Sequence, residues 1–256
     1  MQKIVWMTDT HLVTDGEVAG VDVRQRLTDA VAYVNAHYSD AEFCVISGDM
    51  VQEETPATYQ ALQEQLQDLK LKYLPMVGNK DDRQMMKAAL DVPEGCMDDF
   101  VQYAVQIDEG LILCLDTQKS SSAAGQLCPA RMAWIKAALE TAGDRPVYIF
   151  MHHPPMVLDL PAQDEIRLEQ GEAFLDLITA YPNVRHLFIG HVHRAVSGVV
   201  RGIPYATMKA ISFHAPAPRP QWDWDGFEHA NEPANLGVIT LRQSGVNLHY
   251  LQFSEG

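Results

Sequence analysis

Several features that are typical of zinc-stabilised, membrane or secreted proteins are missing from this 256-residue chain. None of its four cysteines lies in a CxxC pair, so a thiolate-based structural zinc site is not indicated. No apolar run approaches the roughly 20 residues that a membrane-spanning helix needs. The first residues, MQKIVW, pass directly into a predicted strand and lack the charged and apolar regions of a signal peptide. We therefore expect a cytoplasmic protein that spans no membrane.

Basic residues are also few, since 19 Lys and Arg stand against 34 Asp and Glu and give a formal net charge of -15. So acidic a chain disfavours nucleic acid or an anionic membrane as a partner. A small anionic substrate stays compatible, because bound metal ions can reverse the local field. The chain shows no internal repeat and no low-complexity tract. With 47% hydrophobic residues it is expected to form a single domain over residues 1–256.

What the sequence does contain is an alternation of short β-rich runs and segments with helical periodicity. Strands are predicted at 3–8, 42–47, 71–77, 146–151 and 184–189, and helices at 22–38, 55–70, 83–91, 129–142 and 168–181. Hairpins are predicted around 108–110 and in two regions after residue 193. Between those two regions, residues 213–235 are too long for an ordinary connection, and we predict a lid or cap at 205–235. This alternation indicates an α/β protein whose helices cover a sheet.

Polar residues of the types that bind metal ions follow five of the predicted strands. They are Asp9 and His11, Asp49, Asn79, His152 and His153, and His191 and His193. Ligands of open α/β sheets bind outside the carboxyl ends of the strands, so these five strand ends are expected to meet in one crevice. Alternate residues of an extended chain point the same way, so Asp9 and His11 can reach one ion together. A glycine before Asp49, Asn79 and His191 permits a tight turn.

The donors in this set are carboxylate, imidazole and amide groups, which suit zinc, manganese or iron. Each piece alone carries little information, because a single histidine after a strand is commonly an ordinary core or surface residue. The complete set, in order and always at a strand end, predicts a metal centre.

The ordered motifs DxH, GD, GN, HHPP and GHVH resemble those of the calcineurin-like metallophosphoesterases. The HHPP, GHVH and GNKDD stretches are most similar to the bacterial class III cyclic-nucleotide phosphodiesterases and glycerophosphodiesterases, and the motifs cover residues 9 to 193. The resemblance implies an α/β fold in the form of a four-layer α/β/β/α sandwich with two facing mixed β-sheets. It also implies two divalent or mixed-valence metal ions, Mn, Fe or Zn. In that pattern the first ion takes Asp9, His11, Asp49 and His193, and the second takes Asp49 as a bridge, Asn79, His152 and His191.

The activity that the resemblance implies is hydrolysis of small phosphodiesters, either glycerophosphodiesters or cyclic nucleotides, by a hydroxide that bridges the two ions beside Asp49. Phosphomonoesterase activity on the same metal core is an alternative. A second alternative is a non-catalytic scaffold that kept the fold, although all seven ligands are present. The resemblance further suggests a homo-oligomer, a dimer or larger, and the β-rich tail could pair across subunits.

This sequence departs from the family pattern at Lys80, where the family usually has a histidine that protonates the leaving group or stabilises the phosphoryl charge. Histidine is suited to proton transfer near pH 7, and lysine ordinarily is not. Lys80 is therefore an acid with a lowered pKa, a fixed clamp for phosphate, or a residue outside catalysis, and we favour the clamp. Asp81 and Asp82 are expected to share the rim of the site with it. His153 either faces substrate, orients a metal ligand or is structural.

The predicted lid holds further candidates. His214 could approach the metal centre from the lid, or it could be an ordinary loop histidine. The aromatic cluster of Trp222, Trp224 and Phe227 could stack a nucleobase or enclose a choline-type cation. Packing of the lid against itself is the alternative for that cluster.

Overall fold

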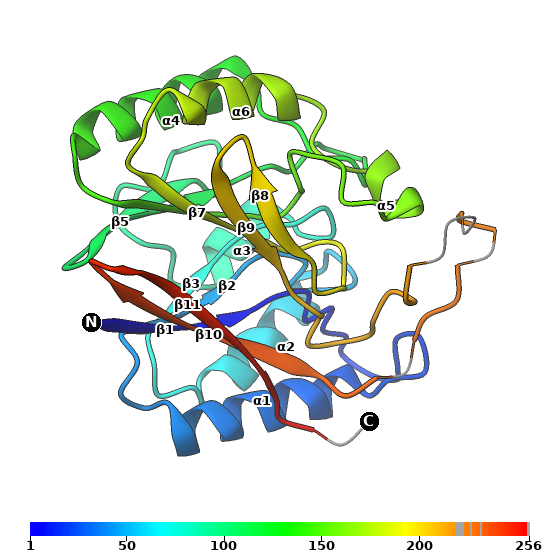
Figure 1. Ribbon diagram of the computed structural model, residues 1–256. Coiled ribbons are helices and arrows are strands. Elements are labelled where there is room, and N and C mark those ends of the chain that lie inside the picture. Colours follow the sequence, from blue (N-terminus) through cyan, green and yellow to red (C-terminus); the bar gives the residue numbers. More distant parts are fainter. Residues whose placement is uncertain (219–222, 226, 231, 255–256) are drawn as a thin grey trace.

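Two β-sheets packed face to face form the centre of the computed structural model, which describes residues 1–218, 223–225, 227–230 and 232–254 (Figure 1). The first sheet has the order β11-β10-β1-β2-β3. Its strands are β1 (Gln2–Met7), β2 (Phe43–Ile46), β3 (Tyr73–Pro75), β10 (Asn235–Arg242) and β11 (Gly245–Gln252). Strands β1, β2 and β3 run parallel, while β10 and β11 are antiparallel additions at one edge. The sheet is therefore mixed.

The second sheet has the order β4-β5-β6-β7-β9-β8. Its strands are β4 (Tyr103–Ile107), β5 (Gly110–Leu115), β6 (Val147–Met151), β7 (Val184–Ile189), β8 (Ser197–Val200) and β9 (Ile203–Thr207). Strands β5, β6, β7 and β9 are parallel, and the two edge strands pair antiparallel through hairpins. This sheet too is mixed, as the sequence resemblance implied.

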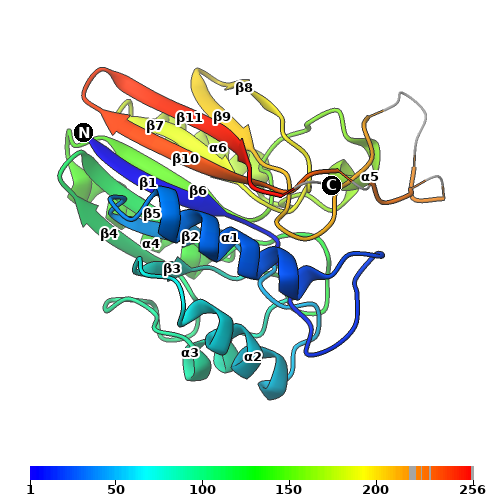
Figure 2. The ribbon, with the colours of Figure 1, turned by 90° about the horizontal axis from the view of Figure 1, so that it is seen from below.

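Helices cover the outer face of each sheet. Those on the first sheet are α1 (Val23–His37), α2 (Pro56–Leu66) and α3 (Arg83–Ala89), and those on the second are α4 (Pro129–Ala142) and α6 (Gly171–Thr179). Figure 1 shows α4 and α6 above the two sheets and α1 and α2 below them, and Figure 2 shows α1 lying across the first sheet. The predicted four-layer α/β/β/α sandwich is confirmed. Among the described residues, no helix is long and apolar enough to cross a membrane.

Local chemistry sets the starts of the helices. Thr55 caps α2 by accepting a hydrogen bond from the amide of Thr58 at 3.1 Å, and Pro56 occupies the first helical position, where its missing N–H costs nothing. Helix α2 ends at Leu66, four residues before the predicted end. The short α5 (Pro161–Glu165) was not predicted, because five residues are too few to show helical periodicity.

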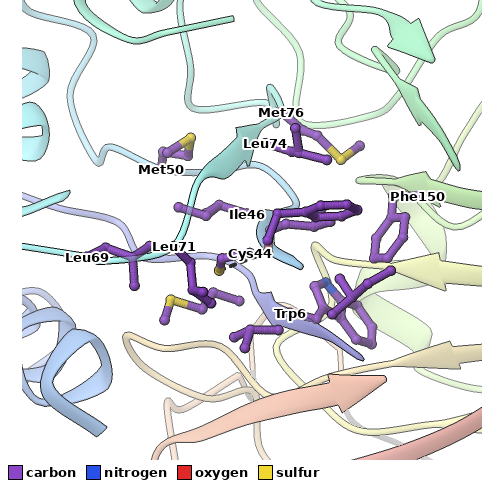
Figure 3. Close-up of a cluster of buried hydrophobic side chains, with 14 of the residues drawn as sticks. Trp6, Cys44, Ile46, Met50, Leu69, Leu71, Leu74, Met76 and Phe150 are labelled. Atoms are coloured by element: carbon purple, nitrogen blue, oxygen red, sulfur yellow. Dashed lines mark hydrogen bonds between the residues drawn. The ribbon is translucent and has the colours of Figure 1, made fainter. Parts of the chain in front are cut away.

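The space between the sheets is filled by large side chains from both. Trp6 of β1 meets Phe188 of β7 edge to face, with ring centroids 5.5 Å apart, and Phe188 stacks on Phe150 of β6 at 4.6 Å. Figure 3 shows Trp6 and Phe150 side by side, with Cys44 in the same core. Cys44 is fully buried and unpaired. These contacts hold the two sheets together and so fix the relative positions of their strand ends.

A long excursion connects β9 to β10. We call residues 208–234 the lid segment, and its described part contains no helix and no strand. One isolated antiparallel bridge, between His214 and Ala230, ties its two halves together. The excursion lies beside α5 at the carboxyl ends of the strands (Figures 1 and 2).

Candidate metal centre

All seven predicted metal ligands lie in loops that directly follow β1, β2, β3, β6 and β7. Six of them are buried and the seventh, Asn79, is partly exposed. Within the described chain, three overlapping groups bring their ligand atoms within 4.8 Å of one another. These groups are Asp9, His11 and His193; Asp9, Asp49 and His152; and His152, His153 and His191. The strand ends predicted from sequence thus converge in one place.

The first group surrounds the carboxylate oxygen Oδ1 of Asp9. Nε2 of His193 lies 3.2 Å from that oxygen, and Nε2 of His11 lies 4.0 Å from it. The two Nε2 atoms are 3.1 Å apart. Asp49 closes the group, because its Oδ2 lies 3.5 Å from Nε2 of His11. Four donor atoms therefore face a common point.

The second group uses the other oxygen of Asp49. Its Oδ1 lies 3.5 Å from Nε2 of His152, which is itself 3.3 Å from Nδ1 of His191. Asp49 therefore directs one oxygen to each group, an arrangement that lets one carboxylate serve both. The same Oδ1 accepts a hydrogen bond of 2.7 Å from the amide of Lys80, which joins the loop of Asn79 to Asp49.

Each of three imidazoles is oriented by a hydrogen bond on its outer side. The bonds run from His11 Nδ1 to Gln52 Oε1 at 2.7 Å, from His193 Nδ1 to the Phe213 carbonyl at 2.7 Å and from His152 Nδ1 to the Ser47 carbonyl at 2.9 Å. A carbonyl only accepts, so the Nδ1 atoms of His152 and His193 carry the proton. In the neutral rings the Nε2 atoms then have lone pairs that point into the centre, the usual arrangement of histidines that bind metal.

The donor set fits two metal ions. Asp9 Oδ1 and Asn79 Oδ1 are buried and have no hydrogen-bond partner among the described residues. An oxygen in that position costs free energy unless a cation takes the place of a hydrogen-bond donor. Carboxylate, amide and imidazole donors without thiolate match the ligands of zinc, manganese and iron.

The protonation of the ligands supports the same conclusion. Burial would raise the pKa of Asp49, but His152 and His11 lower it well below its usual range, so the carboxylate is ionised. Burial lowers the pKa of His11 to about 4 and that of His191 to about 3, so both rings are neutral near pH 7. Burial opposes protonation of His152 as well, yet Asp49 and Asp9 raise its pKa to about 9, and Asp9 raises the pKa of His193. The two buried carboxylates therefore favour positive charge between them, which a proton or a metal ion can supply.

The backbone of the ligands is unusual. Asp9, His11, Asp49, His191 and His193 all have positive φ, between 44° and 72°. The left-handed region is uncommon for residues other than glycine, although Asp and His are enriched there. A residue kept in this strained backbone conformation costs roughly 1–3 kcal/mol, and such residues concentrate at functional sites. The five positions are maintained by the surrounding packing.

The glycines before three ligands are required by close packing as well as by turn geometry. A Cβ on Gly48 would lie 2.6 Å from Nδ1 of His152, and one on Gly190 would lie 3.0 Å from the same atom. A Cβ on Gly78 would overlap the Asp49 carboxylate. The three strand ends therefore pack directly around His152.

Comparison with known proteins identifies the family. The family model described as calcineurin-like phosphoesterase matches residues 2–195, which is most of the chain. The chain belongs to the calcineurin-like phosphoesterases. Members of this metallophosphoesterase family are hydrolases that use a dinuclear metal centre, and the clustered Asp and His residues occupy its place here.

Two curated relatives and one solved structure illustrate the similarity. A probable cyclic nucleotide phosphodiesterase of Rhodopseudomonas palustris is 35% identical over 98% of this chain and 92% of its own length. A glycerophosphodiester phosphodiesterase of Enterobacter lignolyticus is 30% identical over 82% of this chain and 77% of its own length. A dimetal phosphatase from Danio rerio shares the fold, with a TM-score of 0.76 at 13% identity, over 99% of this chain and 97% of that one.

The three charges after Asn79 have three different environments. Lys80 is exposed and lines a polar cavity of about 740 Å³, which it shares with Asn79, Gln118 and a run of three serines. Asp81 also lines this cavity, but it is only 1% exposed. Its carboxylate accepts hydrogen bonds from the backbone amides of Met50 and Gly78, at 3.1 and 2.8 Å. Asp81 thus ties the GD loop to the GN loop.

Asp82, the third of these charges, caps helix α3. Its side chain accepts a hydrogen bond of 2.8 Å from the amide of Met85. The side chain also borders the cavity that Lys80 lines, so its place at the rim agrees with expectation. Capping was not predicted for it, although Asp before a helical run is a usual signal for that role.

His153 is fully buried beside the second group. Its Nδ1 lies 2.7 Å from the Thr117 hydroxyl, and its Nε2 lies 3.2 Å from the Ala123 carbonyl. The ring centroid is 4.6 Å from that of His191. Both nitrogens of His153 thus face protein atoms, and its ring contacts that of a predicted ligand.

His214 is buried and its Nε2 lies 3.1 Å from the carbonyl of Ala210 within the lid segment. Trp224 and Phe227 lie next to each other, with ring centroids 5.3 Å apart, and Trp222 lies outside the described residues. Sequence reasoning did not single out Gln52, Thr117 or Phe213, which contact the histidines from outside. Only the three-dimensional structure shows these contacts, since none of the three residues stands at a fixed distance along the sequence from the histidine that it contacts.

Proposed function

We propose that this chain hydrolyses small phosphodiesters, glycerophosphodiesters or cyclic nucleotides, at a binuclear metal centre. The observation that carries the proposal is the pair of donor groups joined by Asp49, which directs Oδ2 to His11 and Oδ1 to His152. The similarity to a probable cyclic nucleotide phosphodiesterase and to a glycerophosphodiester phosphodiesterase supports the substrate class.

The proposed ligands are Asp9, His11, Asp49 and His193 for one ion, and Asp49, Asn79, His152 and His191 for the other. When bound, two divalent ions supply a nucleophile at neutral pH and neutralise charge on the attacking and leaving oxygens of an in-line displacement at phosphorus. The carboxylates of Asp9 and Asp49 supply two negative charges, against the four positive charges of two divalent ions. The centre would then attract an anionic diester despite the acidic chain. We propose manganese, iron or zinc as the metals.

The remaining residues have distinct proposed roles. Asp49 holds the two halves of the centre together and keeps the loop of Asn79 in place through the Lys80 amide. The Lys80 side chain, exposed at the polar cavity, clamps a phosphate oxygen or the polar arm of the substrate. His153 positions His191 and does not itself transfer a proton, since Thr117 and Ala123 engage its nitrogens.

We also propose a cytoplasmic location and a homo-oligomer, a dimer or larger. The four cysteines are all unpaired, as in a reducing compartment. Strand β11 lies at an edge of the first sheet, where a second copy could pair with it.

Hydrolysis of bis(4-nitrophenyl) phosphate and of 4-nitrophenyl phosphate by the metal-reconstituted protein tests the proposal. We expect a higher kcat/KM on the diester, and a loss of about 10³-fold or more in Asp49→Asn. Asp144→Asn is the matched control, because Asp144 is exposed ahead of the amino end of β6, away from the centre. A strong preference for the monoester would establish the phosphomonoesterase alternative. Hydrolysis of neither compound would support a non-catalytic scaffold.

A further inference from the structure

A chain of buried hydrogen bonds leads from the core between the two sheets to the carboxylate of Asp9. Nε1 of Trp6 donates to the Ser47 hydroxyl at 2.8 Å, and that hydroxyl donates to the Thr8 hydroxyl at 2.8 Å. The Thr8 hydroxyl in turn donates to Oδ2 of Asp9 at 2.6 Å. All four residues are fully buried, where hydrogen bonds are stronger than in water. Of the four, only Asp9 has a role in the proposed function.

The direction of every bond in this chain is fixed by its two ends. The indole N–H of Trp6 can only donate, and the carboxylate of Asp9 can only accept. Each hydroxyl between them has a single proton. The Ser47 proton therefore points to Thr8, and the Thr8 proton points to Asp9. Reversing either hydroxyl would leave a buried polar group without its partner, which costs free energy.

The chain determines which oxygen of Asp9 faces the metal centre. Oδ2 accepts from the Thr8 hydroxyl and also from the amide of His191 at 3.1 Å. Oδ1 has no hydrogen-bond partner among the described residues and lies within 4.0 Å of Nε2 of both His11 and His193. With two donors on one oxygen and none on the other, the carboxylate is held in one orientation, with Oδ1 toward the centre.

Packing fixes the rest of the chain. The Trp6 ring meets Phe150 and Phe188 edge to face, so its N–H cannot turn away from Ser47 without disturbing the core between the sheets (Figure 3). At the other end, a Cβ on Gly190 would lie 2.5 Å from the Thr8 hydroxyl. The glycine of the GHVH motif therefore leaves the room that this hydroxyl occupies.

Resting on the metal centre of the proposed function, we propose that Thr8 and Ser47 are positioning residues for the first metal ion, and that Trp6 fixes the direction of their hydrogen bonds. They act through Asp9, because they keep its Oδ1 directed at the ion and its Oδ2 away from it. Outer partners of this kind typically change metal affinity about 10- to 100-fold. The second ion takes no ligand from Asp9 and should be little affected.

Titration of the metal-free protein with Zn²⁺, in competition with a chromophoric chelator, measures the Kd of each site. His11→Asn and Asn79→Ala identify the two sites, because each variant removes a proposed ligand of one ion only. We expect Thr8→Val, which replaces the hydroxyl by a methyl group, to weaken the first site about 10- to 100-fold and the second site less than about threefold. Thr8→Ser keeps the hydroxyl and should bind both ions within about threefold of wild type.

A double-mutant cycle tests whether the residues act as a chain. Ser47→Ala keeps the carbonyl that accepts from His152 but removes the bond to Thr8, and it should weaken the first site about twofold to tenfold. Because Ser47 acts on Asp9 only through Thr8, the double variant should bind the first ion no more weakly than Thr8→Val alone. Thr240→Val makes the same exchange at a buried position of β10, near the amino end of β1, and should leave both affinities unchanged.

Urea unfolding of the metal-free variants separates positioning from packing. If Thr8→Val lost stability but kept both zinc affinities, the chain would only stabilise the core, and this proposal would be overturned while the proposed function stood. Equal losses at both sites, or additive losses in the double variant, would overturn it too. A wild-type protein that binds two zinc ions and hydrolyses no diester would overturn the proposed function and leave the positioning role standing. Absence of zinc binding would overturn both.

Discussion

The Nε2 atoms of His11 and His193 lie 3.1 Å apart, although each ring already uses its Nδ1 atom on a protein oxygen. When both rings are neutral, this arrangement turns their Nε2 lone pairs toward each other. The arrangement is repulsive by itself and favourable around a cation. The fold therefore holds its ligands in place at a cost that metal binding offsets.

Metal removal should accordingly lower the thermal stability of this protein. Metal at about 100 times its Kd contributes about 2.7 kcal/mol, which corresponds to a fall in Tm of roughly 5–10 °C after chelation in a chain of this size. Differential scanning calorimetry before and after chelator treatment measures the fall in Tm, and added metal should restore the original Tm. His193→Asn should lose most of the chelator effect. His249→Asn, at an exposed position on β11, should behave as wild type; an undiminished effect in His193→Asn would contradict the ligand assignment.

Two adjacent aspartates should respond very differently to the same substitution. Asp81→Ala leaves the buried amides of Met50 and Gly78 without an acceptor and should cost about 2–4 kcal/mol. Asp82→Ala removes one helix cap and should cost about 1 kcal/mol. Urea unfolding of the metal-free variants measures both. Metal content should fall only in Asp81→Ala, because Asp81 joins two ligand loops; equal effects in the two variants would refute that role.

Most of the metal centre could be predicted from sequence because the ends of the strands can be recognised in it. Each β-rich run ends at a glycine or directly at an Asp or His, and parallel strands bring such ends to one edge. The polar residues between strand and helix at 79–82 look alike in the sequence. Only burial distinguishes Lys80, which is exposed, from Asp81, which accepts hydrogen bonds from two loops.

Two other features had no signal in the sequence. The positive φ of Asp9, Asp49 and His191 arises because neighbouring loops constrain the backbone there, and nothing in a short polar stretch specifies that constraint. Periodicity predicted the helices and strands but did not divide the strands between two sheets. That division depends on contacts such as Trp6 with Phe188, which join residues far apart in the chain.

Glu232 should make the anchoring of the lid segment dependent on pH. Burial alone would raise its pKa, but hydrogen bonds from Arg194 and Lys209 lower it from an ordinary 4.5 to about 2. A carboxyl with a lowered folded-state pKa stabilises the fold above pH 4.5, and that contribution is lost as the pH falls toward 2. After allowance for solvent screening we expect about 1–2 kcal/mol.

The difference in unfolding free energy between wild type and Glu232→Gln, measured on metal-free protein, follows this contribution. It should be largest near pH 6 and should shrink steadily below pH 4.5. Glu228→Gln is the control, since Glu228 is an exposed carboxylate of the same lid segment. A difference that stays constant down to pH 3 would show that the ion pairs with Arg194 and Lys209 do not anchor the segment.

Lys80 replaces the family histidine, and substitutions there should separate a clamp from an acid. As a clamp, Lys80 contributes charge at the polar cavity, so Lys80→Met should lower kcat/KM about tenfold on all diesters and Lys80→Arg should retain activity. Lys80→His introduces a group that can donate a proton near pH 7. If protonation of the leaving group limits turnover, Lys80→His should raise kcat on diesters with alkyl leaving groups and change little for 4-nitrophenolate, which needs no proton. Steady-state kinetics on a matched alkyl and nitrophenyl pair decides the matter, because an equal response of both substrates to Lys80→His would rule out an acid role at this position.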